Sequence, residues 1–312
     1  MSGKLKKYLE YYILLVFCAC LSTAFAQDTR YIGSYHQKFD INTGASRDFV
    51  SLQDNQKKYK PNNPMSLKLG FSVKNSIWAL SYGFKIGSTI NDKMPKTKFF
   101  DFQLHHYEQK YIIDLYLQRY KGFYSDLFVM QPYPQMQVRQ YGVEGAYLFN
   151  GERFSAKAAF AQSEKQLRSA GSIIAGTGTY FNQVDLGAGE KPVDNVQIGT
   201  SAGYAYSYVI NESWLLSGAL SGGINAGVHI SGERKGKMVF MPNTLSRLSF
   251  SYNRENWTLA LRALINTRHY SPFTSDVLNL NAGSLQLAFI WRFYETPVFV
   301  EKIIDKMRNY SR

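Results

Sequence analysis

Residues 99–121 alternate between apolar and polar side chains on both sides of a short turn. Before the turn, Phe100, Phe102 and Leu104 alternate with polar residues, and residues 111–117 continue the pattern after it. Because successive side chains of a β-strand point to opposite faces, this segment predicts a hairpin with one apolar and one polar face. The spacing does not fit the 3.6-residue period of a helix. A soluble β-sandwich would show the same alternation, so the hairpin alone does not define the environment of the chain.

The first 26 residues have the three parts of a secretory signal peptide. Lysines come first, residues 13–19 are apolar, and Ala-Phe-Ala at residues 24–26 forms a cleavage site. The apolar run is too short for a helix that spans a membrane. Cys18 and Cys20 both lie within it, so we expect a mature chain without disulfides. A lipoprotein acylated at Cys20 is the alternative, but the residues before it match that signal poorly.

The composition beyond the signal peptide favours an outer-membrane β-barrel over a helical membrane protein. The chain has 23 Tyr, 21 Phe and 24 Gly, and no segment after the signal approaches the length of an apolar transmembrane helix. Its formal net charge of +13 suits contact with the phosphates of lipopolysaccharide. We expect no nucleic-acid partner, because the chain is exported and lacks a basic cluster with interleaved aromatic residues.

The expected fold is therefore all-β: an antiparallel transmembrane β-barrel of about twelve strands, with short periplasmic turns and long external loops. We expect the barrel over residues 46–293, after a periplasmic lead-in at residues 27–45. Residues 294–312 would form a periplasmic C-terminal tail, either a short helix with apolar positions at helical spacing or a frayed end.

The strand count depends on how residues 150–195 are interpreted. Asn150 and Gly151 form a strong two-residue hairpin signal. The count takes residues 154–160 as the strand after this hairpin, and residues 162–195 as one long external excursion. All short turns then fall on one side and all longer loops on the other, as in bacterial outer-membrane barrels. One further spanning strand over residues 172–184 would break this parity.

Aromatic residues follow the short turns on the apolar face of their strands. Aromatic residues at one height on the outside of a barrel form an interfacial girdle. A soluble sandwich would bury these faces and would seldom leave every short turn on one side. The residues expected in a periplasmic girdle are Trp78, Tyr111, Phe154, Trp214 and Trp257.

Four segments resemble a known family: residues 98–105 (Lys-Phe-Phe-Asp-Phe-Gln-Leu-His), 120–124, 133–136 and 160–172. In combination they are similar to the domain-of-unknown-function family 4421 of Bacteroidetes-type bacteria, over most of the mature chain. Gln135 departs from the pattern, since an acidic residue is expected there. The resemblance implies an exported, outer-membrane β-barrel protein in a Gram-negative envelope. It implies no established activity, substrate or catalytic residue.

The polar face of the hairpin carries the candidate chemistry. With a turn at Gln109 and Lys110, His105 faces Asp114 across the two strands. Opposed residues lie about 4.5–5.5 Å apart at Cβ, so a histidine–carboxylate hydrogen bond is reachable, as in general acid–base sites. The alternative is a polar ladder that fills the lumen. This ladder consists of Asp101, Gln103, His105, Asp114, Tyr116 and Gln118.

A second polar group is expected at the external rim of the barrel. It would bind a ligand or order the long loop through hydrogen bonds, and the ordering interpretation is favoured. The remaining histidines lack a second ligand at metal-binding spacing, so we expect no metal and no other cofactor. The rim residues are Ser163, Glu164, Gln166, Arg168 and Ser169.

Two classes of function remain open, with a weaker third. The first is a non-enzymatic outer-membrane barrel, acting as a narrow or plugged pore or as a structural or accessory subunit of an envelope complex. The second is an outer-membrane lipid or peptide hydrolase that uses His105 and Asp114, or the rim around Ser163 and Glu164. The third is a soluble periplasmic β-protein. The expected partners are outer-membrane lipids including lipopolysaccharide, the barrel-assembly machinery during insertion, and an envelope-complex subunit.

Overall fold

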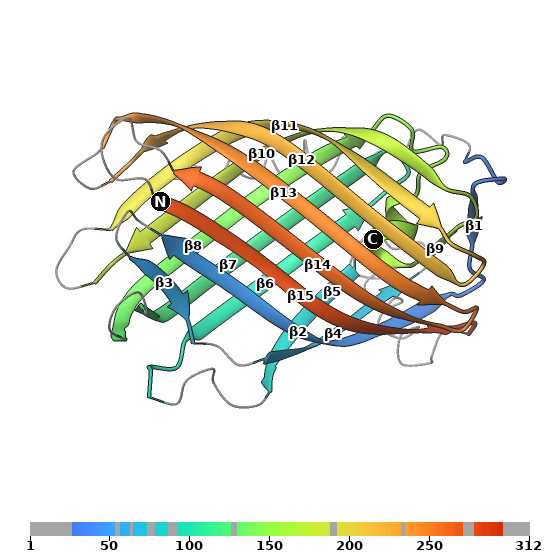
Figure 1. Cartoon of the computed structure of the whole chain (residues 1–312), viewed down its shortest axis with the longest axis horizontal. Helices are drawn as coiled ribbons and strands as arrows, with labels where there is room; N and C mark the ends of the chain where they lie inside the picture. Colours follow the sequence, from blue (N-terminus) through green and yellow to red (C-terminus); the bar gives the residue numbers. More distant parts are fainter. Residues whose placement is uncertain are drawn as a thin grey trace, which may run out of the picture.

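The computed structural model describes residues 27–53, 57–62, 65–73, 79–86, 93–125, 130–187, 192–231, 235–270 and 278–295. They form an all-β fold in which antiparallel strands close into a barrel (Figure 1). The predicted signal peptide lies outside these residues, as does nearly all of the predicted C-terminal tail. Within the described residues, no helix is long and apolar enough to cross a membrane.

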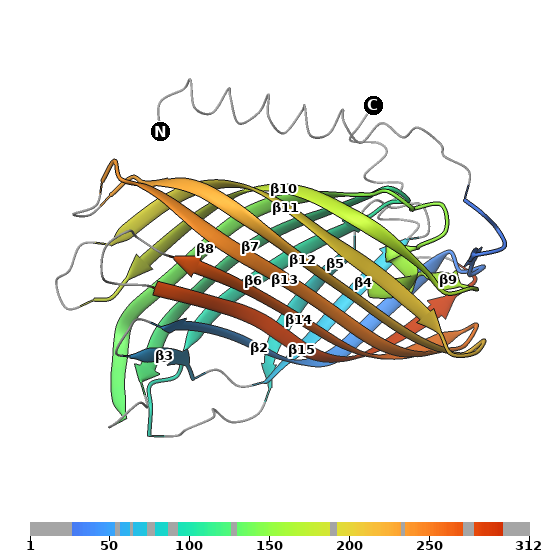
Figure 2. The same cartoon turned by 45° about the horizontal axis from the view of Figure 1, so that its top comes forward.

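Each wall strand pairs antiparallel with the next wall strand along the chain, and the last pairs with the first to close the barrel. The steep tilt of the strands is clear in the second view (Figure 2). The wall strands are β2 (Phe39–Gln53), β4 (Met65–Val73), β5 (Ala79–Ile86), β6 (Lys98–Tyr107), β7 (Tyr111–Ser125), β8 (Gln131–Leu148), β10 (Ala170–Asp185), β11 (Val193–Val209), β12 (Trp214–His229), β13 (Met238–Asn253), β14 (Trp257–Tyr270) and β15 (Leu278–Phe293).

The two ends of the barrel differ in their connections. The β6–β7, β11–β12 and β13–β14 connections are short and lie at one end, which we call the short-turn end. Apart from the β8–β10 connection, which folds into the barrel at the short-turn end, the longer connections lie at the other end. We call this the long-loop end, and here β3 (Lys58–Pro61) bridges β2 and β7. Residues 27–38 and 294–295 lie at the short-turn end. The first wall strand, β2, begins at Phe39, inside the stretch of residues 27–45 that was predicted as a lead-in. The predicted turn at residues 74–76 lies outside the described residues.

Side chains alternate between an apolar outer face and a largely polar inner face. On β12, Leu216, Leu220 and Ile224 point outward and are exposed, whereas Ser217 and Asn225 point inward and are buried. The period of two that predicts strands also predicts this segregation, because one register places most apolar side chains of a strand on the same face.

The outward aromatic residues at the short-turn end form contacts across neighbouring strands. Tyr111 packs edge-on against Tyr147, and Trp214 stacks on Phe250 with 4.8 Å between ring centroids. Trp257 continues this row on β14. Phe154 does not belong to it: its side chain is fully buried, so that part of the girdle prediction is wrong. Trp78 lies outside the described residues.

The prediction for residues 150–195 is also wrong in its assignment of strands. Residues 157–161 form a short π-helix, η1 (Lys157–Ala161), and the strand that follows β8 in the wall is β10. A wall strand must leave one face outside the barrel, but Phe154, Ala156, Ala158 and Phe160 are all buried. Their alternation in the sequence reflects internal packing. Residues 149–153 form a turn, but no wall strand follows it, because the chain folds into the barrel there. The predicted Asn150–Gly151 hairpin is therefore wrong as well.

Candidate functional site: an inner plug and a polar lumen

The connection from β8 to β10 folds into the short-turn end of the barrel, and we call residues 149–169 the inner plug. It contains η1 and β9 (Glu164–Gln166). β9 pairs with β1 (Ile32–Ser34), which belongs to the N-terminal lead-in. Figure 1 shows η1 within the ring of wall strands, close to β9. The plug therefore joins the lead-in and the barrel wall into one unit.

Apolar packing holds the plug against the inner wall. Phe154 and Phe160 lie in one buried cluster with Ile112 of β7 and Leu148 of β8. The two phenylalanine rings meet edge-on, with centroids 6.5 Å apart. Ala159 of η1 and Ala156 directly before it belong to the same cluster, and their small side chains let the helical turn fit close to the wall.

Gln162 connects the end of the plug helix to three wall strands. It adopts a left-handed backbone conformation with φ 56° and is fully buried. Its Nε2 donates to Ser249 Oγ of β13 at 3.0 Å, and Arg262 Nε of β14 donates to its Oε1 at 2.8 Å. Arg292 of β15 donates to the Gln162 carbonyl and to Thr258 Oγ1. Buried hydrogen bonds to charged groups contribute more than neutral ones, so these contacts anchor the plug.

The predicted histidine–carboxylate pair is present in the lumen. His105 is paired with Asp114 in the predicted register, and His105 Nδ1 donates to Asp114 Oδ1 at 2.6 Å. The other carboxylate oxygen accepts a hydrogen bond from Arg247 of β13, whose second nitrogen donates to Tyr107 Oη at 3.2 Å. Sequence reasoning missed Arg247, although its polar position beside the outward Leu248 indicates an inward side chain.

Each oxygen of the Asp114 carboxylate thus accepts a hydrogen bond, one from His105 and one from Arg247. The contacts of His105 in the described structure are to Asp114 and, by ring stacking, to Tyr107. A catalytic base needs a nucleophile or substrate proton within hydrogen-bond reach. No such nucleophile contacts this pair among the described residues. Its geometry is that of an ion-pair network joining β6, β7 and β13.

The remaining ladder residues also lie in the lumen. Asp101 accepts hydrogen bonds from Gln103, Gln118 and Tyr120 at 2.9–3.2 Å. Tyr116 lies across Gly142 of β8, where an added Cβ would lie 2.5 Å from the tyrosine ring, so only glycine leaves room for it. Polar side chains thus fill the middle of the barrel, as expected for inward positions.

A second apolar cluster lies toward the long-loop end of the lumen. It combines inward residues of β2, β7, β8, β13 and β15 with Tyr59 of β3. Between this cluster and the inner plug lies the polar middle described above. Its members are Val50, Leu52, Tyr59, Tyr120, Phe123, Met136, Val138, Met241 and Leu280.

The predicted external rim lies at the opposite end from that expected. Ser163, Glu164, Gln166, Arg168 and Ser169 belong to the inner plug at the short-turn end, because the chain re-enters the wall only at β10. Ser155 Oγ donates to Glu164 at 2.6 Å, and the amide N–H of Val209 donates to Ser169 Oγ at 2.9 Å. Both contacts are hydrogen bonds within the chain, and loop ordering in place of ligand binding stays a prediction for these residues.

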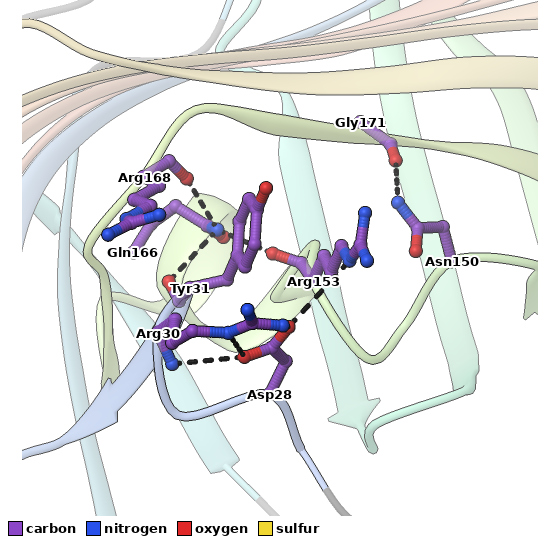
Figure 3. Close-up of polar contacts among 8 residues, drawn as sticks. All are labelled: Asp28, Arg30, Tyr31, Asn150, Arg153, Gln166, Arg168 and Gly171. Carbon is purple, nitrogen blue, oxygen red and sulfur yellow. Dashed lines mark hydrogen bonds and ion pairs between the residues drawn. The ribbon is translucent and has the colours of Figure 1, made fainter.

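Gln166 is the centre of the contacts in Figure 3. Its Nε2 lies 2.6–3.2 Å from the carbonyl oxygens of Tyr31, Arg153 and Arg168, and its Oε1 accepts from the amide N–H of Ser155 at 2.9 Å. The Tyr31 ring lies between the guanidinium groups of Arg153 and Arg168. One buried glutamine side chain thereby fixes the lead-in to the plug.

Asp28 adds an ionic contact to the same assembly. The Arg30 side chain donates to both carboxylate oxygens at 2.9 Å, and Arg153 lies nearby. The hydrogen bonds from Arg30 lower the pKa of the Asp28 carboxyl to about 2. Burial raises the pKa of Tyr35. The guanidinium of Arg292, whose central carbon lies 3.6 Å from the centroid of the Tyr35 ring, has the opposite and smaller effect.

The described residues contain no cluster of three or more histidine, cysteine or acidic side chains that could hold a metal ion. The outer and inner faces of the wall together define the class of protein: a closed antiparallel β-barrel with an internal plug and a polar lumen. The chain belongs to the family described as a domain of unknown function, DUF4421, whose model matches residues 26–293. This agrees with the resemblance found in the sequence.

Curated proteins offer no match to this sequence. Solved structures with a similar arrangement include the outer membrane protease OmpT from Escherichia coli (7% identity, TM-score 0.37, 87% of this chain and 100% of that one). The Pseudomonas putida toluene transporter TodX is similar too (7% identity, TM-score 0.29, 86% of this chain and 98% of that one). So is the CymD monoaromatic hydrocarbon channel (7% identity, TM-score 0.34, 83% of this chain and 89% of that one).

Proposed function

We propose that this protein is a non-enzymatic outer-membrane barrel of about twelve spanning strands, closed from within, that serves as a plugged pore or accessory subunit of the envelope. The observation that carries the proposal is the attachment of Gln162 to Arg262 and Arg292, which ties the inner plug to β14 and β15. The proposed orientation places the short-turn end in the periplasm, because long loops are external in bacterial barrels.

Membrane insertion is supported by the outer surface. Leu220, Ile224 and Leu248 are each more than half exposed and point outward from adjacent strands. Such a continuous apolar surface is unfavourable in water and stable in a bilayer. The signal peptide would direct export, and the barrel-assembly machinery would insert the chain into the outer membrane.

Closure of the lumen is supported at three levels. The inner plug occupies the short-turn end, ion pairs and amide groups occupy the middle, and the apolar cluster around Phe123 and Met136 occupies the long-loop end. A barrel of this size has a narrow lumen that side chains can fill. We therefore expect little steady conductance. The hydrolase alternative is weaker, because Asp114 is engaged by both His105 and Arg247.

The first test is gel migration of the outer-membrane fraction, with unboiled and boiled samples side by side. Faster migration before boiling, together with low conductance in planar bilayers, is the expected result for a closed, detergent-resistant barrel. Extraction as a water-soluble protein without a mobility shift would overturn membrane insertion. A large and steady open-channel current from the wild-type protein would overturn the plug as a permanent closure.

A further inference from the structure

Four basic residues form a compact group on the outer wall of β6, β7 and β8. The pairing places Lys98 directly opposite Lys121, and Arg119 directly opposite Arg139. We call Lys98, Arg119, Lys121 and Arg139 the four-cation patch. They face outward, because their neighbours Tyr120, Val138 and Gln140 are buried inside the barrel.

Two directly opposed like-charged pairs are unfavourable by themselves. Side chains at opposed positions have Cβ atoms about 4.5–5.5 Å apart, and like charges there destabilise a sheet. Arg119 and Lys121 lie on the same face of β7, so the two pairs stand side by side. Such an arrangement is stable when an anion lies between the cations.

The acidic side chains of this outer face lie at one side of the patch. By register, Asp185 is on β10 opposite Gln137, and Asp194 is one strand further, on β11. Asp185 accepts from the amide N–H of Gly187 at 2.9 Å, and Asp194 accepts from Gln183 at 2.7 Å. Arg139 donates to Gln137 at 2.9 Å, but its buried Nε has no hydrogen-bond partner in the described structure. The described contacts therefore leave the patch without a carboxylate.

The patch lies at the boundary of the apolar belt. One step toward the short-turn end, Phe102, Leu117 and Tyr141 occupy the same outer face, and Tyr141 stacks on Phe181 with centroids 5.9 Å apart. Toward the long-loop end, β6 begins at Lys98 itself, and β7 ends at Ser125. Figure 2 also shows β6, β7 and β8 as neighbours in the wall. Acyl chains against the aromatic row would place a headgroup at the height of the cations.

We propose that the four-cation patch binds the phosphorylated sugar headgroup of an outer-leaflet glycolipid, with its acyl chains along Phe102, Leu117 and Tyr141. Arginine recognises phosphate oxygens in a bidentate manner, and lysine adds a point charge. This proposal rests on the membrane orientation given under the proposed function. It places the lipid partner expected from the sequence at a defined site on the wall.

The test uses full-length protein extracted from outer membranes, with bisphosphorylated lipid A in detergent as the probe. The variants R119Q/R139Q and K98Q/K121Q each remove two cations. The matched control K235Q/K237Q removes two exposed lysines from the β12–β13 connection. Because each basic residue near an anionic lipid surface contributes about fivefold in affinity, we expect roughly 20–30-fold weaker binding for each patch variant and little change for the control.

Three further arms identify the source of the anion and keep the outcomes separate. Phosphatidylglycerol and inorganic phosphate should each bind much more weakly than lipid A. Thermal unfolding should show a sign reversal: without lipid, R119Q/R139Q should be as stable as wild type or more stable, and with lipid A it should be less stable. Equal lipid A affinity in wild type and both patch variants, or equal binding of phosphatidylglycerol, would overturn the proposal.

A variant that lacks the boiling-dependent mobility shift of wild type is misfolded, and the other double variant then gives the result. Failure of wild type to show that shift contradicts the proposed function instead.

Discussion

Arg262 Nε of β14 donates a 2.8 Å hydrogen bond to Oε1 of Gln162, a residue 100 positions earlier in the chain. This contact attaches the end of η1 to the barrel wall far from the strands between which the plug is inserted. A plug held only by its own connections to β8 and β10 could move out of the lumen as a unit. The attachment to β14 opposes that movement.

Replacement of Gln162 by glycine should loosen the plug. Glycine accepts the left-handed backbone at this position, so the change removes the side-chain contacts to Arg262 and Ser249 without backbone strain. Loss of partners for buried groups should lower stability by about 1–3 kcal/mol. The measurement is thermal unfolding of the mobility-shifted form, with single-channel recording for new openings.

The control for this change is Gln135→Gly in an exposed position of β8. Glycine in a strand should lower stability by about 0.5–1 kcal/mol, and no openings should appear. Equal effects of the two substitutions on conductance would contradict an anchoring contribution of Gln162.

Asp114→Asn should be among the most destabilising single changes in the lumen. It leaves Arg247 buried without its counter-charge, and breaking a buried ion pair typically destabilises by about 3–5 kcal/mol. Adding Arg247→Gln to this variant should recover part of the loss, because the unpaired charge is then removed. Chemical unfolding in detergent, analysed as a double-mutant cycle, measures the coupling. Purely additive losses would show that the two residues act independently.

The hairpin over residues 99–121 could be predicted down to its register. Its alternation is clear over residues 100–105 and 113–118 and its turn is short, so one register places most of the apolar side chains outside; Ile112 and Tyr120 are inward exceptions. That register brings His105 opposite Asp114, as observed. The third member of the network, Arg247, lies 133 residues from Asp114, and a local pattern cannot pair residues at that separation.

The inner plug could not be predicted from alternation. Phe154 and Phe160 have the spacing of a strand, but all of their surroundings are protein, and no exposed face exists to set a period. The strand that the count placed within a long external excursion, β10, carries small or weakly apolar outward residues such as Ala175 and Thr177, so its period of two is faint. An error in this one connection transferred Ser163 to Ser169 to the wrong end of the barrel.

Phe154 and Tyr111 should respond differently to truncation. Phe154→Ala creates a cavity in the packed plug and should lower stability by about 3–5 kcal/mol. Tyr111→Ala removes an outward ring that is 47% exposed in the protein, so lipid can fill the space and the loss should be smaller. Unfolding midpoints in one detergent compare the two directly. A larger loss at Tyr111 would contradict the burial of Phe154 within the plug.

Gln166→Leu should release the lead-in from the plug. The substitution leaves the carbonyl groups of Tyr31 and Arg153 and the amide of Ser155 without their side-chain partner. We expect faster tryptic cleavage after Arg30 and Arg153 in detergent-solubilised protein, monitored by mass spectrometry. Cleavage after Lys235 at the long-loop end is the internal reference and should proceed at the wild-type rate.

The contact between Asp28 and Arg30 should be stable at neutral pH and weaken only in strong acid. The folded-state pKa of Asp28 is about 2, below its ordinary value of 3.8, so the carboxylate form is the one that the fold favours. The stabilisation is therefore complete above about pH 4 and is lost as the pH falls through about 2. Carboxyl ¹³C shifts of Asp28 across this range measure the transition directly. Arg30→Gln should move the midpoint up toward the ordinary value, because the principal donor is gone. An unchanged midpoint in that variant would mean that Arg30 does not set the ionisation of Asp28.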